Sequence, residues 1–247
     1  KRKQLKFEIH NEPDSMEYFA GTHEEFLPVL QGTAAVLRDA GLVSYCCAFT
    51  SSYMARLNDE DTRERKIAFH RELDRSFLDS SYGFSFHYYR HLGSFGRPAD
   101  FAAKTVVRDP HDAGEYEGKN PPLYIPKTRA AITEFNILAG TPNDQYQTEF
   151  NNYMMVYYLA ELLAVTYEND IDRVYLWKLQ DDAQASGVEL GFFDKLGAPR
   201  EGYRSFLKVL ALVRHGYRVE RTPRSIDIIG KDRVLHVALA PHDFTTR

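Results

Sequence analysis

The chain has 247 residues, of which 43% are hydrophobic and 27% charged, and its formal net charge is −4. This length suffices for one α/β barrel or two small domains. The charge gives no excess of basic residues to hold a nucleic-acid backbone or an anionic membrane, and no run approaches the about 18 apolar residues of a membrane span. The only cysteines, Cys46 and Cys47, are adjacent, which excludes a disulfide framework but does not indicate a compartment.

Short β-rich runs alternate with longer amphipathic runs along most of the chain. The predicted strands are Lys6–Asn11, Val43–Thr50, Phe84–Tyr89, Ala130–Asn136 and Arg173–Leu179. The predicted helices are Glu24–Ala40, Asp59–Leu78, Ala99–Val107, Asn143–Tyr167 and Tyr203–Arg214. This alternation predicts a parallel sheet with crossover helices. Two architectures fit the pattern, an open doubly wound sheet or part of an eight-stranded barrel.

The end of the chain has a different pattern. Three short strands are predicted at Tyr217–Glu220, Ser225–Ile229 and Val234–Leu239, separated by turn residues. We therefore expect an α/β body over residues 1–216 and a β-rich antiparallel element over residues 217–247. The loop Asp109–Pro126 is long for a connection in an α/β protein, so it either shapes a site or is a surface excursion.

Two glutamates stand near the ends of predicted strands. Glu12 follows the first strand in the sequence Asn11-Glu12-Pro13, and Glu134 lies in the otherwise apolar fourth strand. α/β enzymes carry reactive groups at the carboxyl ends of parallel strands, and a glutamate in an apolar strand is costly unless it is paired or functional. Two acids held close together divide their roles, one as proton donor and one as anion. The alternative is that one or both form structural salt bridges.

Four strand motifs resemble those of the clan A retaining glycoside hydrolases. The similar segments, in the order of strands 4, 6, 7 and 8 of that clan, are Phe7-Glu8-Ile9-His10-Asn11-Glu12-Pro13, Phe86-His87-Tyr88-Tyr89, Thr133-Glu134-Phe135-Asn136 and Val174-Tyr175-Leu176-Trp177. The segment Gly191–Arg200 resembles the loop that leads to the last barrel helix. With the Phe-Glu-Ile start and the β-rich tail, the chain is most similar to glycoside hydrolase family 39, over residues 5 to about 215.

The resemblance implies a (β/α)8 TIM barrel of which this chain carries strands 4–8, followed by the start of a β-rich, sandwich-like domain. Strands 1–3 would come from an upstream segment or from another chain. We therefore expect the strands at 6–11 and 173–179 to form the two ends of the sheet, with a gap that three more strands would fill.

The resemblance also implies a reaction. The chain would be a retaining glycoside hydrolase that cleaves a β-linked sugar or polysaccharide by double displacement. Glu12 would be the acid/base and Glu134 the nucleophile, with carboxyl groups about 5–5.5 Å apart.

Four further residues are implied to bind substrate. Asn11 would bond the sugar 2-hydroxyl, Tyr89 would hold Glu134, His87 would lie on the same side of its strand as Tyr89, and Trp177 would offer an apolar face to a sugar ring. For His87 and Trp177 the alternatives are a hydrogen-bonded core histidine and a core filler.

Three other features complete the expectations for the site. Glu8 is assigned to polar packing inside the barrel. His10 stands where relatives often have Trp, which changes a neighbouring subsite. No cofactor is expected, and no metal, because the spacing of the histidines His23, His70, His111 and His236 does not suit a metal site.

Two other classes of function remain as alternatives. A non-hydrolytic carbohydrate-binding barrel is disfavoured because both glutamates are present. An open-sheet nucleotide-binding protein would need a glycine-rich phosphate loop after a strand. The sequence contains neither G-x-G-x-x-G nor G-x-x-x-x-G-K-[ST], the two common motifs of such loops. A panel of aryl glycosides would discriminate among these classes.

Overall fold

The computed structural model describes residues 5–14, 18–49, 82–91, 106–107, 123–125, 128–138, 145–176, 178–180, 191–222 and 225–238. The chain divides into two compact units. The first comprises Lys1–Tyr88, Val106–Phe135 and Asp170–Tyr175, and the second comprises Tyr89–Thr105, Asn136–Asn169 and Leu176–Arg247.

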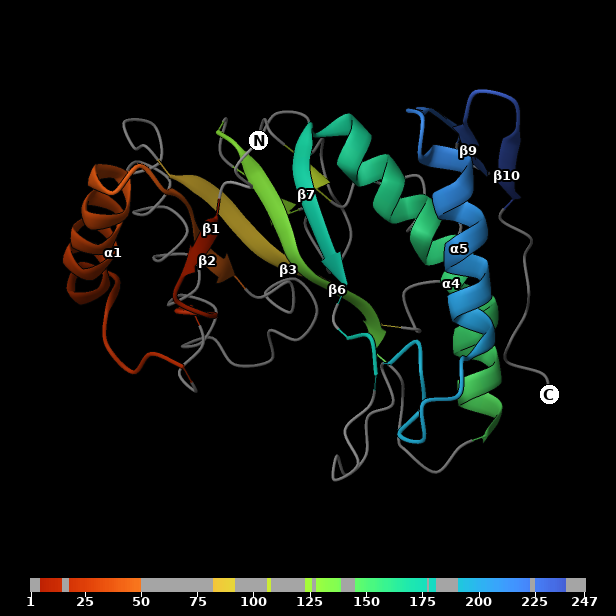
Figure 1. The fold of residues 1–247 in the computed structure, drawn as a ribbon, viewed down its shortest axis with the longest axis horizontal. Coiled ribbons are helices and arrows are strands. Elements are labelled where there is room, and N and C mark those ends of the chain that lie inside the picture. The colour runs from red at the N-terminus through yellow and green to blue at the C-terminus, as the bar shows by residue number, and fades with distance from the viewer. Residues whose placement is uncertain are drawn as a thin grey trace, which may run out of the picture. The chain divides into compact units, whose positions relative to one another are not determined.

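A five-stranded parallel sheet with the order β1-β2-β3-β6-β7 organises the fold (Figure 1). Its strands are β1 (Lys6–Ile9), β2 (Val43–Phe49), β3 (Gly83–His91), β6 (Ala130–Leu138) and β7 (Ile171–Leu176). The order follows the chain without the reversal of a doubly wound sheet, so the described strands have the arrangement of a partial barrel. The prediction that the first and last strands form the two ends of the sheet is confirmed.

The sequence predicts most elements to within a few residues, with one error. The predicted helix Ala99–Val107 is wrong at its end, because Val106–Val107 is the strand β4, paired in parallel with β5 (Leu123–Tyr124). Two adjacent β-branched valines favour an extended backbone. The strand predicted at Arg173–Leu179 begins earlier, at Ile171, and ends at Leu176. The predicted helix Asp59–Leu78 lies outside the described residues.

Helix α1 (His23–Asp39) packs beside β1 and β2 (Figure 1). It begins with a capping box, in which the Thr22 hydroxyl accepts the Glu25 N–H and the Glu25 carboxylate accepts the Thr22 N–H at 2.8 Å. Such reciprocal bonds satisfy two backbone donors that a helix start would leave free. Its buried residues are spaced four apart, as a helix that covers a sheet with one face requires: Phe26, Leu30 and Ala34.

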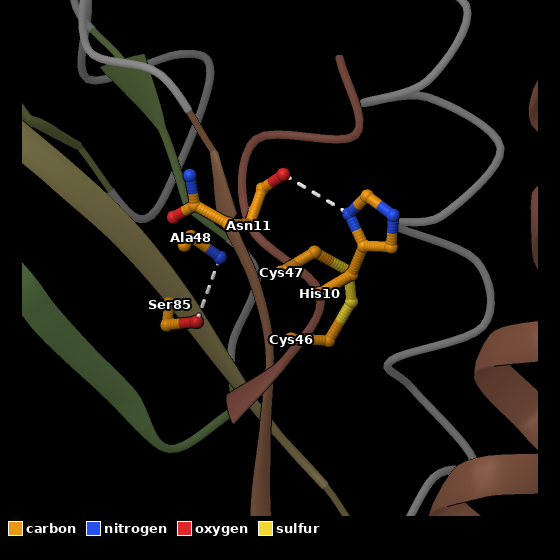
Figure 2. The surroundings of a disulfide bond; sticks show 6 residues. All are labelled: His10, Asn11, Cys46, Cys47, Ala48 and Ser85. Atoms are coloured by element: carbon orange, nitrogen blue, oxygen red, sulfur yellow. Dashed lines mark hydrogen bonds between the residues drawn. A yellow bond between two sulfur atoms is a disulfide. The ribbon is translucent and has the colours of Figure 1, made fainter. Parts of the chain in front are cut away.

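Strand β2 is buried and contains a bulge. The pairing with β3 shifts register between Cys46 and Phe49, and Ala48 has a positive φ of 53°. A disulfide joins Cys46 to its neighbour Cys47 (Figure 2), so it links no two elements of the fold. The bulge turns the Ala48 N–H toward β3, where it donates to the Ser85 hydroxyl oxygen at 2.9 Å.

Tyr45 ties distant strands of the sheet together. Tyr45 lies on β2, and its hydroxyl donates a hydrogen bond to Asp172 Oδ2 of β7 at 3.0 Å. The same hydroxyl accepts a hydrogen bond from Lys6 Nζ of β1 at 3.3 Å. Because β3 and β6 lie between β2 and β7, this contact requires the sheet to curl. Burial, and next the bond to Asp172, raise the pKa of Tyr45 to about 12.

This raised pKa predicts a loss of stability in alkali. The folded chain holds the Tyr45 proton above the unfolded value of about 10, so this contribution is complete below about pH 10 and is lost as the pH rises toward 12. In urea unfolding between pH 8 and 12, Tyr45→Phe should therefore show a shallower decline in unfolding free energy than the wild type. Tyr175→Phe, at an exposed position of β7, is the control. Equal slopes for wild type and Tyr45→Phe would contradict the prediction.

In the second unit, the described residues form two helices and an antiparallel sheet. Helix α4 (Gln145–Glu168) packs against α5 (Glu201–Val213) and against the sheet. The sheet has the order β10-β9-β8. Its strands are β8 (Arg218–Thr222), β9 (Ser225–Ile229) and β10 (Val234–Ala238).

Side-chain bonds connect this sheet region to α4. The Tyr217 hydroxyl donates to the Leu163 carbonyl at 3.1 Å, and Arg221 Nε donates to Glu168 at 3.0 Å. The predicted antiparallel element is therefore present. A complete sandwich-like domain and the division at residue 216 stay predictions. Of the helices in the described ranges, none is both long and apolar enough to cross a membrane.

Candidate active site

The backbone after β1 takes an unusual path toward β3. His10 and Glu12 both have positive φ, at 68° and 46°, a region that side chains disfavour. Such residues cost on the order of 1–3 kcal/mol each and occur often at functional sites. The His10 ring is fixed by edge-on contacts with Phe19 and Phe26, at 5.8 and 5.3 Å between centroids.

Glu12, His87 and Glu134 form one cluster. The imidazole Nδ1 of His87 lies 2.7 Å from Glu12 Oε1 and 3.5 Å from Glu134 Oε2. The His87 side chain is 2% exposed, whereas those of Glu12 and Glu134 are 19% and 23% exposed. A buried imidazole therefore contacts two carboxyl groups that solvent, and hence a ligand, can reach.

The shared nitrogen limits how far apart the two carboxyl groups lie. Glu12 Oε1 and Glu134 Oε2 can be no farther apart than the distances of 2.7 and 3.5 Å laid end to end. That limit applies to one oxygen of each group, and it is compatible with the roughly 5–5.5 Å between the carboxyl groups of retaining glycosidases.

The protonation of His87 decides what the shared nitrogen does. With a proton on Nδ1, the ring donates to Glu12 and faces Glu134 at the longer distance, which suits two anionic acceptors. With the proton on Nε2, Nδ1 accepts instead, and Glu12 must then carry the proton as an acid. Either arrangement fixes the Glu12 carboxyl group, and the two differ by a single proton position.

The other residues predicted for the site are placed less completely. Asn11 is exposed, and its backbone carbonyl lies 3.0 Å from His10 Nδ1 (Figure 2). Tyr89 lies in β3, but its side chain is not among the described parts, and Trp177 is outside the described residues. Glu134 is not at a strand end as expected, because β6 continues for four residues beyond it.

Glu8, which the sequence assigns to polar packing inside the barrel, lies near this cluster. Its carboxyl group lies among Ser85, Thr133, His87 and Glu134. Burial is the largest influence and raises the pKa of Glu8, while the Ser85 hydroxyl lowers it. Ser85 and His87 are two residues apart in β3, so their side chains share a face of the sheet. This spacing was the available sequence signal that a hydroxyl group lies beside His87.

Within the ranges that the structure describes, no group of three His, Cys, Asp or Glu side chains is arranged to hold a metal ion.

The fold is similar to that of several solved glycoside hydrolases. A GH39 β-xylosidase from Caulobacter crescentus matches with 17% identity and a TM-score of 0.53, over 94% of this chain and 47% of its own. The GH39 enzyme from Xanthomonas axonopodis pv. citri matches with 16% identity and a TM-score of 0.53, over 94% and 45%. Xylanase 10B from Thermotoga maritima matches with 12% identity and a TM-score of 0.50, over 84% and 60%.

These neighbours belong to GH39 and GH10, two families of clan A, so the clan that the motifs indicate is also the one whose fold this chain shares. The chain spans about half the length of the two GH39 proteins. No protein-family model and no curated protein sequence matches it.

Proposed function

We propose that the chain belongs to a retaining glycoside hydrolase that cleaves β-linked sugars by a two-glutamate double displacement. The observation that carries the proposal is the contact of Glu12 and Glu134 with one nitrogen of His87, which brings together two solvent-accessible carboxyl groups, as a retaining pair requires. The fold similarity to GH39 and GH10 enzymes supports the same reaction class.

The chemistry divides between the two acids. In the first step, the Glu134 carboxylate attacks the anomeric carbon while Glu12 gives its proton to the departing oxygen, so the glycosidic bond breaks as the glycosyl–enzyme ester forms. In the second step, Glu12 takes a proton from water, and the resulting hydroxide attacks the anomeric carbon and releases Glu134. Two inversions leave the anomeric configuration unchanged.

The neighbouring residues have supporting parts in this proposal. His87 is too buried to lie flat against a sugar, so we assign it to holding Glu12 and Glu134 in place. Asn11 is exposed beside Glu12 and would donate to the sugar 2-hydroxyl. Tyr89 and Trp177 are proposed, from the motif resemblance alone, to hold the nucleophile and to line a sugar subsite.

The sheet edges indicate how the barrel would be completed. Near the β1 edge, Leu5 and Phe7 are 64% and 39% exposed, and Tyr175 of β7 is 46% exposed. Exposed apolar side chains beside unpaired strand edges favour aggregation unless they are covered. We propose that three further parallel strands pair between β1 and β7, supplied by another segment of the same protein or by another chain.

The test is turnover of aryl β-glycosides by the whole protein that contains this chain. Because the named neighbours include a β-xylosidase and a xylanase, aryl β-xylosides come first, followed by glucosides and galactosides. Proton NMR of the first product should show the β anomer before mutarotation. A first-formed α anomer would exclude the double displacement, and sugar binding without turnover of any substrate would favour the non-hydrolytic alternative.

A further inference from the structure

His10 is an exposed aromatic residue close to Glu12 that the proposed double displacement does not use. It directly precedes Asn11 in the segment after β1, and its Cα lies within about 7 Å of that of Glu12, the length of two residues. Its φ of 68° lies in the left-handed region, which histidine and asparagine occupy more often than most other side chains do. Residues in this region often occur where a protein contacts its ligand.

Neighbouring rings restrict the orientation of the His10 ring. Phe26 of α1 is fully buried and meets it edge-on at 5.3 Å between centroids, and Phe19 meets it edge-on at 5.8 Å. Phe19 and Phe26 also contact each other at 5.2 Å, so the three rings form one packed group. The His10 ring is therefore held in place although the residue is exposed.

The hydrogen bond of His10 assigns a role to each ring nitrogen. Nδ1 lies 3.0 Å from the backbone carbonyl oxygen of Asn11 (Figure 2). A carbonyl oxygen only accepts, so Nδ1 carries a proton and donates it, which leaves Nε2 of the neutral ring as an acceptor. Among the described residues, Nε2 has no hydrogen-bond partner. His10 thus offers a fixed and open acceptor, which suits a hydroxyl group as its ligand.

The directions of two side chains separate two sugar positions. Figure 2 shows the Asn11 side-chain amide and the His10 ring on opposite sides of the Asn11 backbone. In the proposed reaction, Asn11 binds the sugar that becomes attached to Glu134, and Glu12 protonates the oxygen that joins this sugar to the leaving group. The His10 ring therefore faces the side of the leaving group. A saccharide leaving group carries hydroxyl donors there, whereas a nitrophenyl group carries none.

We propose that His10 is a specificity-determining residue whose Nε2 accepts a hydrogen bond from a hydroxyl group of the leaving-group sugar. The inference rests on the proposed function, because only that reaction defines a leaving group. It adds a preference for saccharide over aryl leaving groups, which the two glutamates do not supply. The packed rings and the Nδ1 bond hold the acceptor in place before substrate binds, so little freedom is lost on binding.

The test compares two leaving groups in the whole protein that contains this chain. His10→Phe keeps an aromatic ring against Phe19 and Phe26 but removes the acceptor. Its kcat/KM on xylobiose should fall about fivefold to tenfold, the scale of one hydrogen bond, while kcat/KM on 4-nitrophenyl β-xyloside stays within about twofold of the wild type. If the aryl panel identifies another sugar, its β-linked disaccharide and aryl glycoside take these places. His215→Phe, the same change at an exposed position after α5, should alter neither value.

His10→Asn serves as a second variant, because phenylalanine is disfavoured at a positive φ. Asparagine adopts this backbone region more readily, and its shorter side chain does not bring an acceptor to the place of Nε2. This variant should show the same selective loss on xylobiose. A purely structural role for His10, in shaping the chain before Glu12, would lower kcat/KM on both substrates equally and would overturn the inference. Unchanged kcat/KM on xylobiose would also overturn it.

Binding measured without turnover distinguishes this inference from the proposed function. In ¹⁵N NMR of Glu134→Gln, the Nε2 signal of His10, assigned by its absence when His10→Asn is added, should shift when xylobiose binds. A shift in a protein whose wild type hydrolyses no glycoside would show that His10 binds a saccharide although the proposed function fails. An active wild type without the shift and without the selective loss would overturn only the role of His10. Neither activity nor shift would overturn both.

Discussion

Glu134→Gln should lower turnover of every glycoside by about 10⁵-fold, the scale of loss when a covalent nucleophile is removed. Glutamine keeps the size of the side chain and a hydrogen-bonding group 3.5 Å from His87 Nδ1, so the cluster should remain assembled. What it lacks is an anionic oxygen that can attack the anomeric carbon. The loss should appear in kcat for substrates with good and poor leaving groups alike, because no glycosyl–enzyme forms from either.

The matched control for this variant is Glu201→Gln, which makes the same chemical change on the exposed face of α5 and should keep wild-type turnover. A 2-deoxy-2-fluoro glycoside with a good leaving group should label the wild-type protein at Glu134, located by peptide mass spectrometry, and should not label Glu134→Gln. Label on another carboxylate, or more than about 1% residual turnover, would assign the nucleophile elsewhere.

Local patterns in the sequence predicted most of the fold. Helix α1 was placed to within one residue at each end because its apolar spacing is a local signal. The end of β7 was predicted too late, since the apolar run continues past Leu176 although the strand does not. Val106 and Val107 could not be recognised as a strand because their partner, β5, lies more than fifteen residues later.

The candidate active-site cluster could be predicted only in part. Glu12 and Glu134 could be found from the sequence because Glu12 follows a strand in the sequence Asn11-Glu12-Pro13 and Glu134 interrupts an apolar strand, where an acid is costly unless it is paired or functional. Their common contact with His87 could not be predicted, because it depends on the curl of the sheet. The contact between Glu12 and His87, for example, joins residues 75 positions apart.

Glu12→Ala should have an effect that depends on the leaving group. General acid catalysis contributes about 10²–10⁴-fold, and it is needed most when the departing alkoxide is basic. Unactivated β-linked oligosaccharides should therefore lose about 10⁴-fold in kcat/KM. Dinitrophenyl glycosides, whose phenolate leaves without a proton, should keep kcat/KM within about tenfold of the wild type and accumulate the glycosyl–enzyme.

Azide then reports on the second step of the same variant. In Glu12→Ala, no general base activates the water that hydrolyses the glycosyl–enzyme. Azide is a small anion that can occupy the space left by the shorter side chain. It can attack the anomeric carbon directly, because it needs no general base. Added azide should raise kcat of Glu12→Ala on dinitrophenyl glycosides and yield the β-glycosyl azide, whereas Glu134→Ala forms no such ester and should yield none. An equal loss on all substrates without azide rescue would remove Glu12 from the acid/base role. Because His87 contacts both carboxyl groups, such a result would indicate that His87 handles the proton instead.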